Sequence, residues 1–156
     1  MRFLIFYGLL WWLFSPIVLY AETPGIQSFA RTHAPAYAQA EIQRFYRESD
    51  SFTKKFIREN WPRAQSEMDT AGIPKKDQVA LFRIVMKEST WNHTAQNPDS
   101  SAYGYCGTML SAHRKTLTAD FKTNPIAQLL WCHSYAMNRY HGYRAALLHH
   151  QRKNWW

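Results

Sequence analysis

One glutamate in this sequence is placed where it could serve as a general acid. Glu88 lies in the segment 87–107, which reads KESTWNHTAQNPDSSAYGYCG. The preceding apolar residues Leu81, Ile84 and Val85 recur at helical spacing, and Glu88 continues the same stripe at its end. A carboxyl group held against apolar surface is harder to ionise, so we expect its pKa to be raised. A general acid must keep its proton near neutral pH, which favours that role. A Glu at a helix end that simply reaches solvent is the alternative.

Helical patterns account for most of the sequence, so we predict a mainly α fold with no clear strand. Asp77 is placed to cap the helix that leads to Glu88. Another helix is predicted over residues 125–141, because Asn124 can cap it and Pro125 suits its first turn. Its predicted inward stripe consists of Ile126, Leu129, Leu130, His133, Met137 and Tyr140.

The N-terminal half is predicted to be a linker followed by helices. Residues 22–36, ETPGIQSFARTHAPA, contain Pro, Gly and Thr with little periodicity, which is typical of a linker. Apolar residues recur at helical spacing over residues 37–60, and the helix could break near residues 49–51. The helix is expected to stop before Pro62. A short helix is predicted over residues 63–70. The sequence does not decide whether these helices pack on the rest of the chain or bind a partner.

The first 21 residues have the layout of an export signal. Arg2 precedes an uncharged, aromatic-rich run over residues 3–20, and Ala21 then meets an acidic residue. This layout indicates a secretory signal peptide cleaved after Ala21, and the run of ~18 apolar residues makes a retained membrane anchor the alternative. In both cases we expect a periplasmic or secreted protein, with membrane contact only through an uncleaved N-terminal segment. Removal of this segment lowers the formal net charge from +8 to +7, and the basic residues are scattered.

The two cysteines, Cys106 and Cys132, form an even pair. In an oxidising compartment such a pair indicates a disulfide, and two buried thiols are the alternative. The motifs CxxC and HExxH are absent, so neither redox nor zinc-protease chemistry is indicated. We expect no metal and no other cofactor, because the histidines lack tight ligand spacing. They include His113, His133, His141, His149 and His150.

Several ordered motifs resemble the lysozyme-like soluble lytic transglycosylase (SLT) domain family. They are ESTW from Glu88 onward, then NP and SSAYGY, then NPIAQLLW, and then SYAMNRY. The resemblance covers about residues 78–156. It implies a lysozyme-like helical domain over residues 74–156. The sequence pattern itself predicts a last helix over residues 143–152 within this range. Residues 22–73 would then form a linker and helical extension.

Carried over residue by residue, the resemblance makes Glu88 the catalytic acid and Ser89 a neighbour that supports the sugar. The other residues that it implies for glycan binding are Asn97, Ser101, Tyr103, Gly104, Tyr105, Tyr135 and Tyr140. The implied reaction cleaves the β-1,4 bond between N-acetylmuramic acid and N-acetylglucosamine in peptidoglycan. Glu88 would protonate the leaving oxygen and then take the proton of the muramic C6 hydroxyl, which gives a 1,6-anhydro product without water. The implied partners are glycan strands and an envelope-spanning secretion, conjugation or pilus system.

Three alternatives to this function stay open. A hydrolytic muramidase usually needs a second carboxylate, for which Asp99 and Asp120 are candidates, although both positions favour turn-forming or solvated residues. A catalytically weak peptidoglycan-binding scaffold is the second alternative, because Gly107 stands where the family usually has Gln. A nucleic-acid binder is supported by net charge alone, without a recognition motif, so no nucleic-acid partner is expected.

Overall fold

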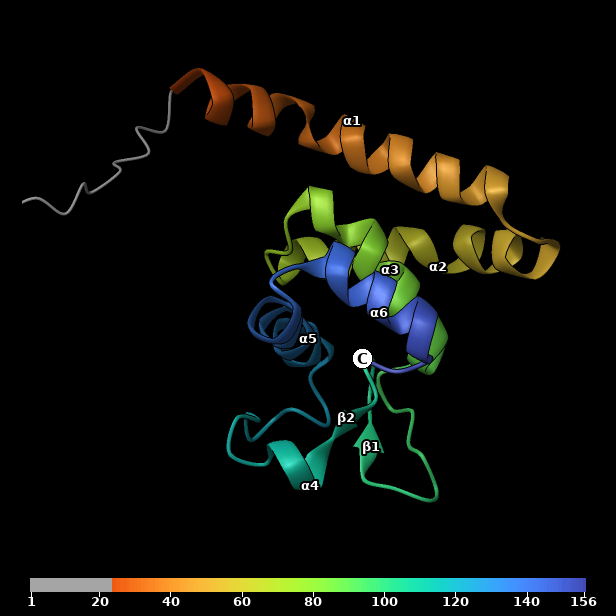
Figure 1. Ribbon diagram of the computed structural model, residues 1–156, viewed down its shortest axis with the longest axis vertical. Coiled ribbons are helices and arrows are strands. Elements are labelled where there is room, and N and C mark those ends of the chain that lie inside the picture. The colour runs from red at the N-terminus through yellow and green to blue at the C-terminus, as the bar shows by residue number, and fades with distance from the viewer. Residues whose placement is uncertain (1–23) are drawn as a thin grey trace, which may run out of the picture.

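A computed structural model describes residues 24–156, with side chains from residue 36 onward, as a mainly α fold (Figure 1). The predicted fold class is confirmed. The described chain comprises α1 (Pro24–Glu48), α2 (Ser51–Thr70), α3 (Lys75–Ser89), β1 (Ala102–Tyr103), β2 (Thr108–Met109), α4 (Leu110–His113), α5 (Pro125–Tyr140) and α6 (Tyr143–Lys153). The predicted signal peptide or anchor over residues 1–21 lies outside the described residues. None of the described helices is long and apolar enough to cross a membrane.

Helix α1 begins earlier than the sequence predicted. It starts at Pro24, so the predicted linker over residues 22–36 is wrong for residues 24–36, which are helical. The predicted break near residues 49–51 is confirmed, because α1 ends there and Asp50 caps α2. An Asp50 carboxylate oxygen accepts a hydrogen bond of 2.7 Å from the Thr53 N–H, which satisfies one of the unpaired amides of the first turn.

Helix α2 runs through Pro62, where the prediction ended a helix. The predicted short helix over residues 63–70 is therefore the second half of α2. Pro62 itself is exposed, whereas Trp61 and Ala64 on either side of it are buried. Proline removes one backbone hydrogen bond, but the burial of its neighbours stabilises the helix in spite of that loss.

One hydrophobic core joins the N-terminal helices to the rest of the molecule. Helix α3 packs against α1, α2 and α6, and α5 packs against α2 and α6 (Figure 1). The aromatic ring of Phe82 on α3 contacts the rings of Phe56 and Trp61 on α2 and that of Trp91. Helices α1 and α2 thus pack on the same core as residues 74–156. Other members of this core include Ile42, Met68, Leu81, Ile84, Val85, Leu129, Ala136, Tyr143 and Ala146.

Helix α3 ends abruptly after the turn that carries Glu88. Its last residue is Ser89, and the next two residues, Thr90 and Trp91, have φ angles of 50° and 58° in the left-handed region. Two successive left-handed residues turn the chain away from the helix axis. At the other end the predicted cap is wrong, because Pro74 is the N-cap residue and Asp77 lies inside the first turn.

Helix α5 is capped as the sequence predicted, but its buried face is different. The Asn124 side-chain oxygen accepts hydrogen bonds of 3.0 and 3.2 Å from the N–H groups of Ile126 and Ala127. Leu130, predicted to point inward, is 48% exposed. Of the predicted stripe only Leu129 is fully buried, because the helix turns its polar Gln128 and its cysteine toward the hairpin. The buried residues of α5 are Gln128, Leu129, Cys132 and Ala136.

Strands β1 and β2 form a short hairpin that the sequence did not predict. They pair antiparallel, with Ala102 opposite Met109 and Tyr103 opposite Thr108. Two residues in each strand are too few for an alternating pattern to be visible in the sequence. The hairpin matters because residues 104–107, which connect the strands, run past the end of α3.

Candidate active site

The Glu88 carboxyl group lies at the end of α3, where α6 and the hairpin loop meet it. Its side chain is only 21% exposed, and its Oε1 atom is 2.7 Å from Nε2 of His150 on α6. Burial is the largest influence on the carboxyl group and raises its pKa, while the hydrogen bond and charge of His150 oppose that rise without cancelling it. The sequence-based expectation of a raised pKa therefore agrees with the environment that the structure gives Glu88.

Gly107 lies beside the other oxygen of Glu88. Its φ angle is +57°, and a Cβ atom built on it would be 3.0 Å from Glu88 Oε2. Any side chain at this position would strain the backbone and press on the carboxyl group. The glutamine that the SLT family usually has at this position would place its Cβ atom in tight contact with Glu88 in this arrangement.

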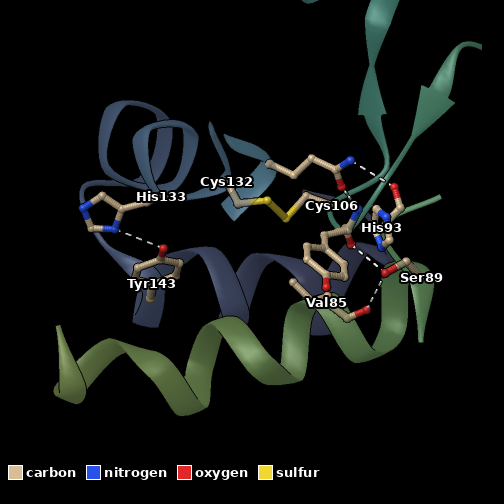
Figure 2. The surroundings of a disulfide bond; sticks show 9 residues. Val85, Ser89, His93, Cys106, Cys132, His133 and Tyr143 are labelled. Carbon is tan, nitrogen blue, oxygen red and sulfur yellow. Dashed lines mark hydrogen bonds between the residues drawn. A yellow bond between two sulfur atoms is a disulfide. The ribbon is translucent and has the colours of Figure 1, made fainter. Parts of the chain in front are cut away.

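The loop that carries Gly107 is held in place from α3 and α5 (Figure 2). The Ser89 hydroxyl donates to the carbonyl oxygen of Tyr105 at 2.9 Å, and it is also 3.2 Å from the carbonyl oxygen of Val85. On the other side, a disulfide joins Cys106 to Cys132 of α5, which confirms the predicted bridge. Ser89 is buried and its hydroxyl stabilises the loop, while its predicted support of the sugar stays a prediction.

Gln128 provides a second, buried anchor for the same loop. Its Oε1 atom accepts a hydrogen bond of 2.9 Å from the N–H of Tyr105, and its Nε2 donates to the carbonyl oxygens of His93 and Phe121, both at 2.9 Å. Gly104, with a φ angle of +77°, packs against this amide so closely that a Cβ atom would overlap the Gln128 side chain. Gly104 is thus required for loop packing.

Tyr105 is a core residue in this structure. Its ring is fully buried, and its hydroxyl donates a hydrogen bond of 2.7 Å to Glu67 Oε2. The indole N–H of Trp91 donates to the same oxygen at 2.9 Å. Burial, together with Glu67, raises the pKa of Tyr105 far above its ordinary value. The burial of Tyr105 does not favour direct contact with a substrate, and its role in glycan binding stays a prediction.

Three other predicted site residues lie on the hairpin and on the loop before it. The Asn97 side chain accepts a hydrogen bond of 2.8 Å from the Asp99 N–H. The Ser101 hydroxyl is 2.7 Å from that of Ser111, and the Tyr103 hydroxyl donates to the carbonyl oxygen of Lys122 at 3.1 Å. Within residues 36–156, none of the three predicted site residues forms a hydrogen bond to Glu88.

Tyr135 and Tyr140 belong to an aromatic cluster on α5 and the C-terminal tail. The ring of Tyr135 stacks on Trp131 with centroids 4.9 Å apart and an interplanar angle of 16°. Its edge contacts include Tyr140 at 6.2 Å and Trp156 at 5.6 Å. The Arg139 guanidinium lies 5.6 Å from the centroid of each of the two tyrosine rings.

Trp131 and Tyr135 also line a hollow of about 680 Å³ between α5 and the segment after α4. Its wall combines these rings with polar side chains, including Asp120, Ser134 and Asn138. This lining offers both kinds of contact that a sugar makes. Aromatic rings can pack against its C–H surface, and hydroxyl, amide and carboxylate groups can bond to its hydroxyls. Glu88 is not among the residues that line this hollow.

The candidate second carboxylates are both on the surface. Asp99 is exposed in a turn, and Asp120 is exposed and accepts a hydrogen bond of 2.6 Å from the Asn124 side chain. Hydrogen bonds from Thr118 and Asn124 lower the pKa of Asp120. Neither aspartate is among the groups that shift the ionisation of Glu88, whereas His150 is. Among residues 36–156, no three His, Cys, Asp or Glu side chains come together as a metal site.

His150 is the site residue that the sequence-based reasoning did not assign. It is 4% exposed, and it lies on the buried side of α6 together with Tyr143 and Ala146. The spacing of these three residues, three and then four apart, is the signal that could have placed His150 on the inner face. Its contact with Glu88 joins residues too far apart in the sequence for any local pattern to reveal.

Compared with family models, with curated proteins and with solved structures, the chain shows no match to any of them.

Proposed function

We propose that this protein is an exported peptidoglycan lytic transglycosylase with a lysozyme-like fold and Glu88 as its acid. The observation that carries the proposal is the environment of Glu88, whose carboxyl group is largely buried, has a raised pKa and faces one imidazole. The motifs around Glu88 that resemble the SLT family add the substrate class. The product would be a glycan fragment that ends in 1,6-anhydro-N-acetylmuramic acid.

A single acid at this position can perform both proton transfers of the reaction. In the protonated state Glu88 donates its proton to the oxygen of the leaving N-acetylglucosamine. The resulting carboxylate then removes the proton of the C6 hydroxyl, and that oxygen attacks C1 of the muramic acid. The carboxyl group ends with the proton it began with, so the cycle requires no water.

No carboxylate in the described chain is among the groups that shift the ionisation of Glu88, which favours this route over hydrolysis. Retaining glycosidases place two carboxyl groups about 5–5.5 Å apart, and inverting glycosidases about 6.5–9.5 Å apart. Asp99 and Asp120 are exposed, have local hydrogen-bond partners and do not influence Glu88. The intramolecular attack of a transglycosylase needs neither of them.

The disulfide and the aromatic hollow support the location and the substrate of the proposed enzyme. A disulfide such as Cys106–Cys132 persists in oxidising compartments, and the periplasm is one of these. The hollow that contains Trp131 and Tyr135 has the aromatic and polar lining that suits sugar rings. We further propose that the enzyme opens the wall locally for an envelope-spanning secretion, conjugation or pilus system.

The chemistry of the released fragments tests the proposed function. The chain without residues 1–21 is incubated with purified peptidoglycan, and the soluble products are identified by mass spectrometry. We expect anhydromuropeptides, which are lighter than the hydrolysis products by the mass of one water. Reducing-end fragments would instead indicate a muramidase. Wall binding without any release would indicate a scaffold.

A further inference from the structure

We propose that His150 is a positioning residue for Glu88. The Nε2–H group of His150 holds Oε1 of Glu88 and leaves Oε2 of Glu88 to exchange protons with the substrate. This inference rests on the proposed function, since it assigns roles to the two oxygens of the proposed acid. The residues that carry it are Glu88 at the end of α3, His150 on α6, and Gly107 in the hairpin loop.

The two oxygens of Glu88 have different surroundings. Oε1 lies 2.7 Å from Nε2 of His150, whose side chain is only 5% exposed. Oε2 receives no hydrogen bond from the described side chains or backbone, and this atom is not fully buried. Oε2 therefore reaches solvent beside Gly107, and it is the oxygen that a glycan can approach.

The surroundings of the imidazole ring favour the tautomer with its hydrogen on Nε2. The other ring nitrogen, Nδ1, is buried and has no hydrogen-bond partner within residues 36–156. A hydrogen on Nδ1 would be a buried donor without an acceptor. This costs more free energy than a hydrogen on Nε2, which has Oε1 of Glu88 as its acceptor. With its hydrogen on Nε2, His150 donates to Oε1 and fixes the plane of the carboxyl group.

No other neighbour of Glu88 in the described chain takes part in holding its carboxyl group. The hairpin loop contributes Gly107, which has no side chain, and Lys87 beside Glu88 on α3 is exposed. His150 is the only charged or titratable group in the described chain that shifts the ionisation of Glu88. A hydrogen bond from one side holds the carboxyl group while the opposite side stays open to the substrate. Such preorganisation is what an acid needs if its proton is to meet the glycosidic oxygen in line.

Two substitutions of His150 distinguish a role as hydrogen-bond donor from a role in which the ring only fills space. His150→Gln keeps a neutral N–H donor, whereas His150→Phe keeps a ring and removes the donor. His141→Asn is the control, because His141 is exposed and its φ angle of 58° is one that asparagine tolerates. Thermal unfolding of each variant verifies that it is folded before other measurements are compared.

The first measurement follows the carboxyl carbon of Glu88 by NMR as the pH is varied. His150→Phe should move the titration of Glu88 to higher pH, because a hydrogen bond that favours the carboxylate has been removed. His150→Gln should move it less, and His141→Asn should leave it unchanged. An unchanged titration in His150→Phe would overturn the proposal, whatever the activity of the protein.

The second measurement is the rate of anhydromuropeptide release from peptidoglycan as substrate concentration and pH are varied. His150→Phe should lower kcat by about 10- to 100-fold with little change in KM, and its activity should extend to higher pH. His150→Gln should retain most of kcat. If His150→Gln loses as much as His150→Phe, a neutral donor is not sufficient and the proposal is wrong. Inactive wild-type protein would refute the proposed function, while the titration would still decide whether His150 holds Glu88.

Discussion

Oε1 of Glu88 and Nε2 of His150 lie 2.7 Å apart, although the two residues are 62 positions apart in the sequence. The contact joins the C-terminal turn of α3 to the last turns of α6. Because both side chains are largely buried, their hydrogen bond is protected from competition with water. This pair and the loop that carries Gly107 define the site on which the proposed activity depends.

Neutralising Glu88 should stabilise the fold more strongly as the pH rises. Because burial raises the pKa of Glu88 in the folded protein, the ionised carboxylate destabilises the folded state. The wild-type protein should lose this part of its stability as the pH rises above 4.5, the ordinary value, and through the raised one. Glu88→Gln cannot ionise, so its melting temperature should exceed that of the wild type increasingly between pH 4 and pH 8.

Glu59→Gln is the matched control for this stability experiment. Glu59 is an exposed residue of α2 whose side chain is 58% accessible. Its neutralisation should leave the pH dependence of the melting temperature unchanged. A Glu88→Gln melting temperature that follows that of the wild type at every pH would show that the carboxyl group is not destabilised by burial.

Substitution of Gly107 by alanine should impair the site as well as the backbone. Gly72→Ala supplies the control, because Gly72 has a φ angle of +69° but no atom within 4 Å of a built Cβ. Both variants should lose about 1 kcal/mol of stability from left-handed backbone strain. Only Gly107→Ala brings a methyl group to Glu88 Oε2, so only it should slow turnover, by about 10- to 100-fold.

Unfolding and turnover assays on the two alanine variants test this distinction. Equal turnover in Gly107→Ala and Gly72→Ala would contradict the account of the carboxyl group's surroundings.

Removal of the disulfide should reduce stability more than activity. The bridge closes a loop with a sequence separation of 26, for which chain entropy predicts a loss of about 3–4 kcal/mol. The hairpin loop stays bonded to Ser89 and Gln128, so its position near Glu88 should persist. Urea unfolding of the double variant Cys106→Ser/Cys132→Ser measures the first effect, and turnover at low temperature measures the second.

A stability change under 1 kcal/mol in the double variant would mean that the bridge hardly constrains the unfolded chain.

Replacement of Trp131 by alanine should weaken binding to peptidoglycan. The indole ring is part of the aromatic wall of the hollow between α5 and the segment after α4. We expect about 10-fold weaker binding, equivalent to about 1.4 kcal/mol. Sedimentation with insoluble peptidoglycan gives the affinity, and Phe52→Ala is a suitable control because Phe52 is 69% exposed on α2, away from the hollow. Equal loss in both variants would assign the effect to general surface hydrophobicity.

The elements with strong local signals could be predicted from the sequence. The cap by Asn124 and the proline after it locate the start of α5 correctly, and the apolar stripe of α3 is buried as its spacing indicated. The pairing of Cys106 with Cys132 followed from their even number. These features depend on hydrogen bonds, on periodicity within a single element, or on residue count.

The features that were missed depend on contacts between distant segments. Pro62 was expected to end a helix, but burial of the neighbouring Trp61 outweighs the lost hydrogen bond. Gln128 was not expected in the core, because a side-chain amide is buried only where hydrogen-bond partners surround it. Here backbone groups of distant loops supply those partners. His150 was considered only as a metal ligand and rejected in that role, since nothing near it in the sequence indicates its contact with Glu88.

The assignment of Glu88 as the acid is tested by comparing anhydromuropeptide release by the wild type and Glu88→Gln, with Glu59→Gln as the control. The amide has nearly the same shape as the acid but cannot donate or accept the catalytic proton. We predict that the wild type and Glu59→Gln release anhydromuropeptides at similar rates, and that Glu88→Gln is slower by about 10²- to 10⁴-fold while it remains folded. Release by Glu88→Gln at the wild-type rate would contradict the assignment of Glu88 as the acid.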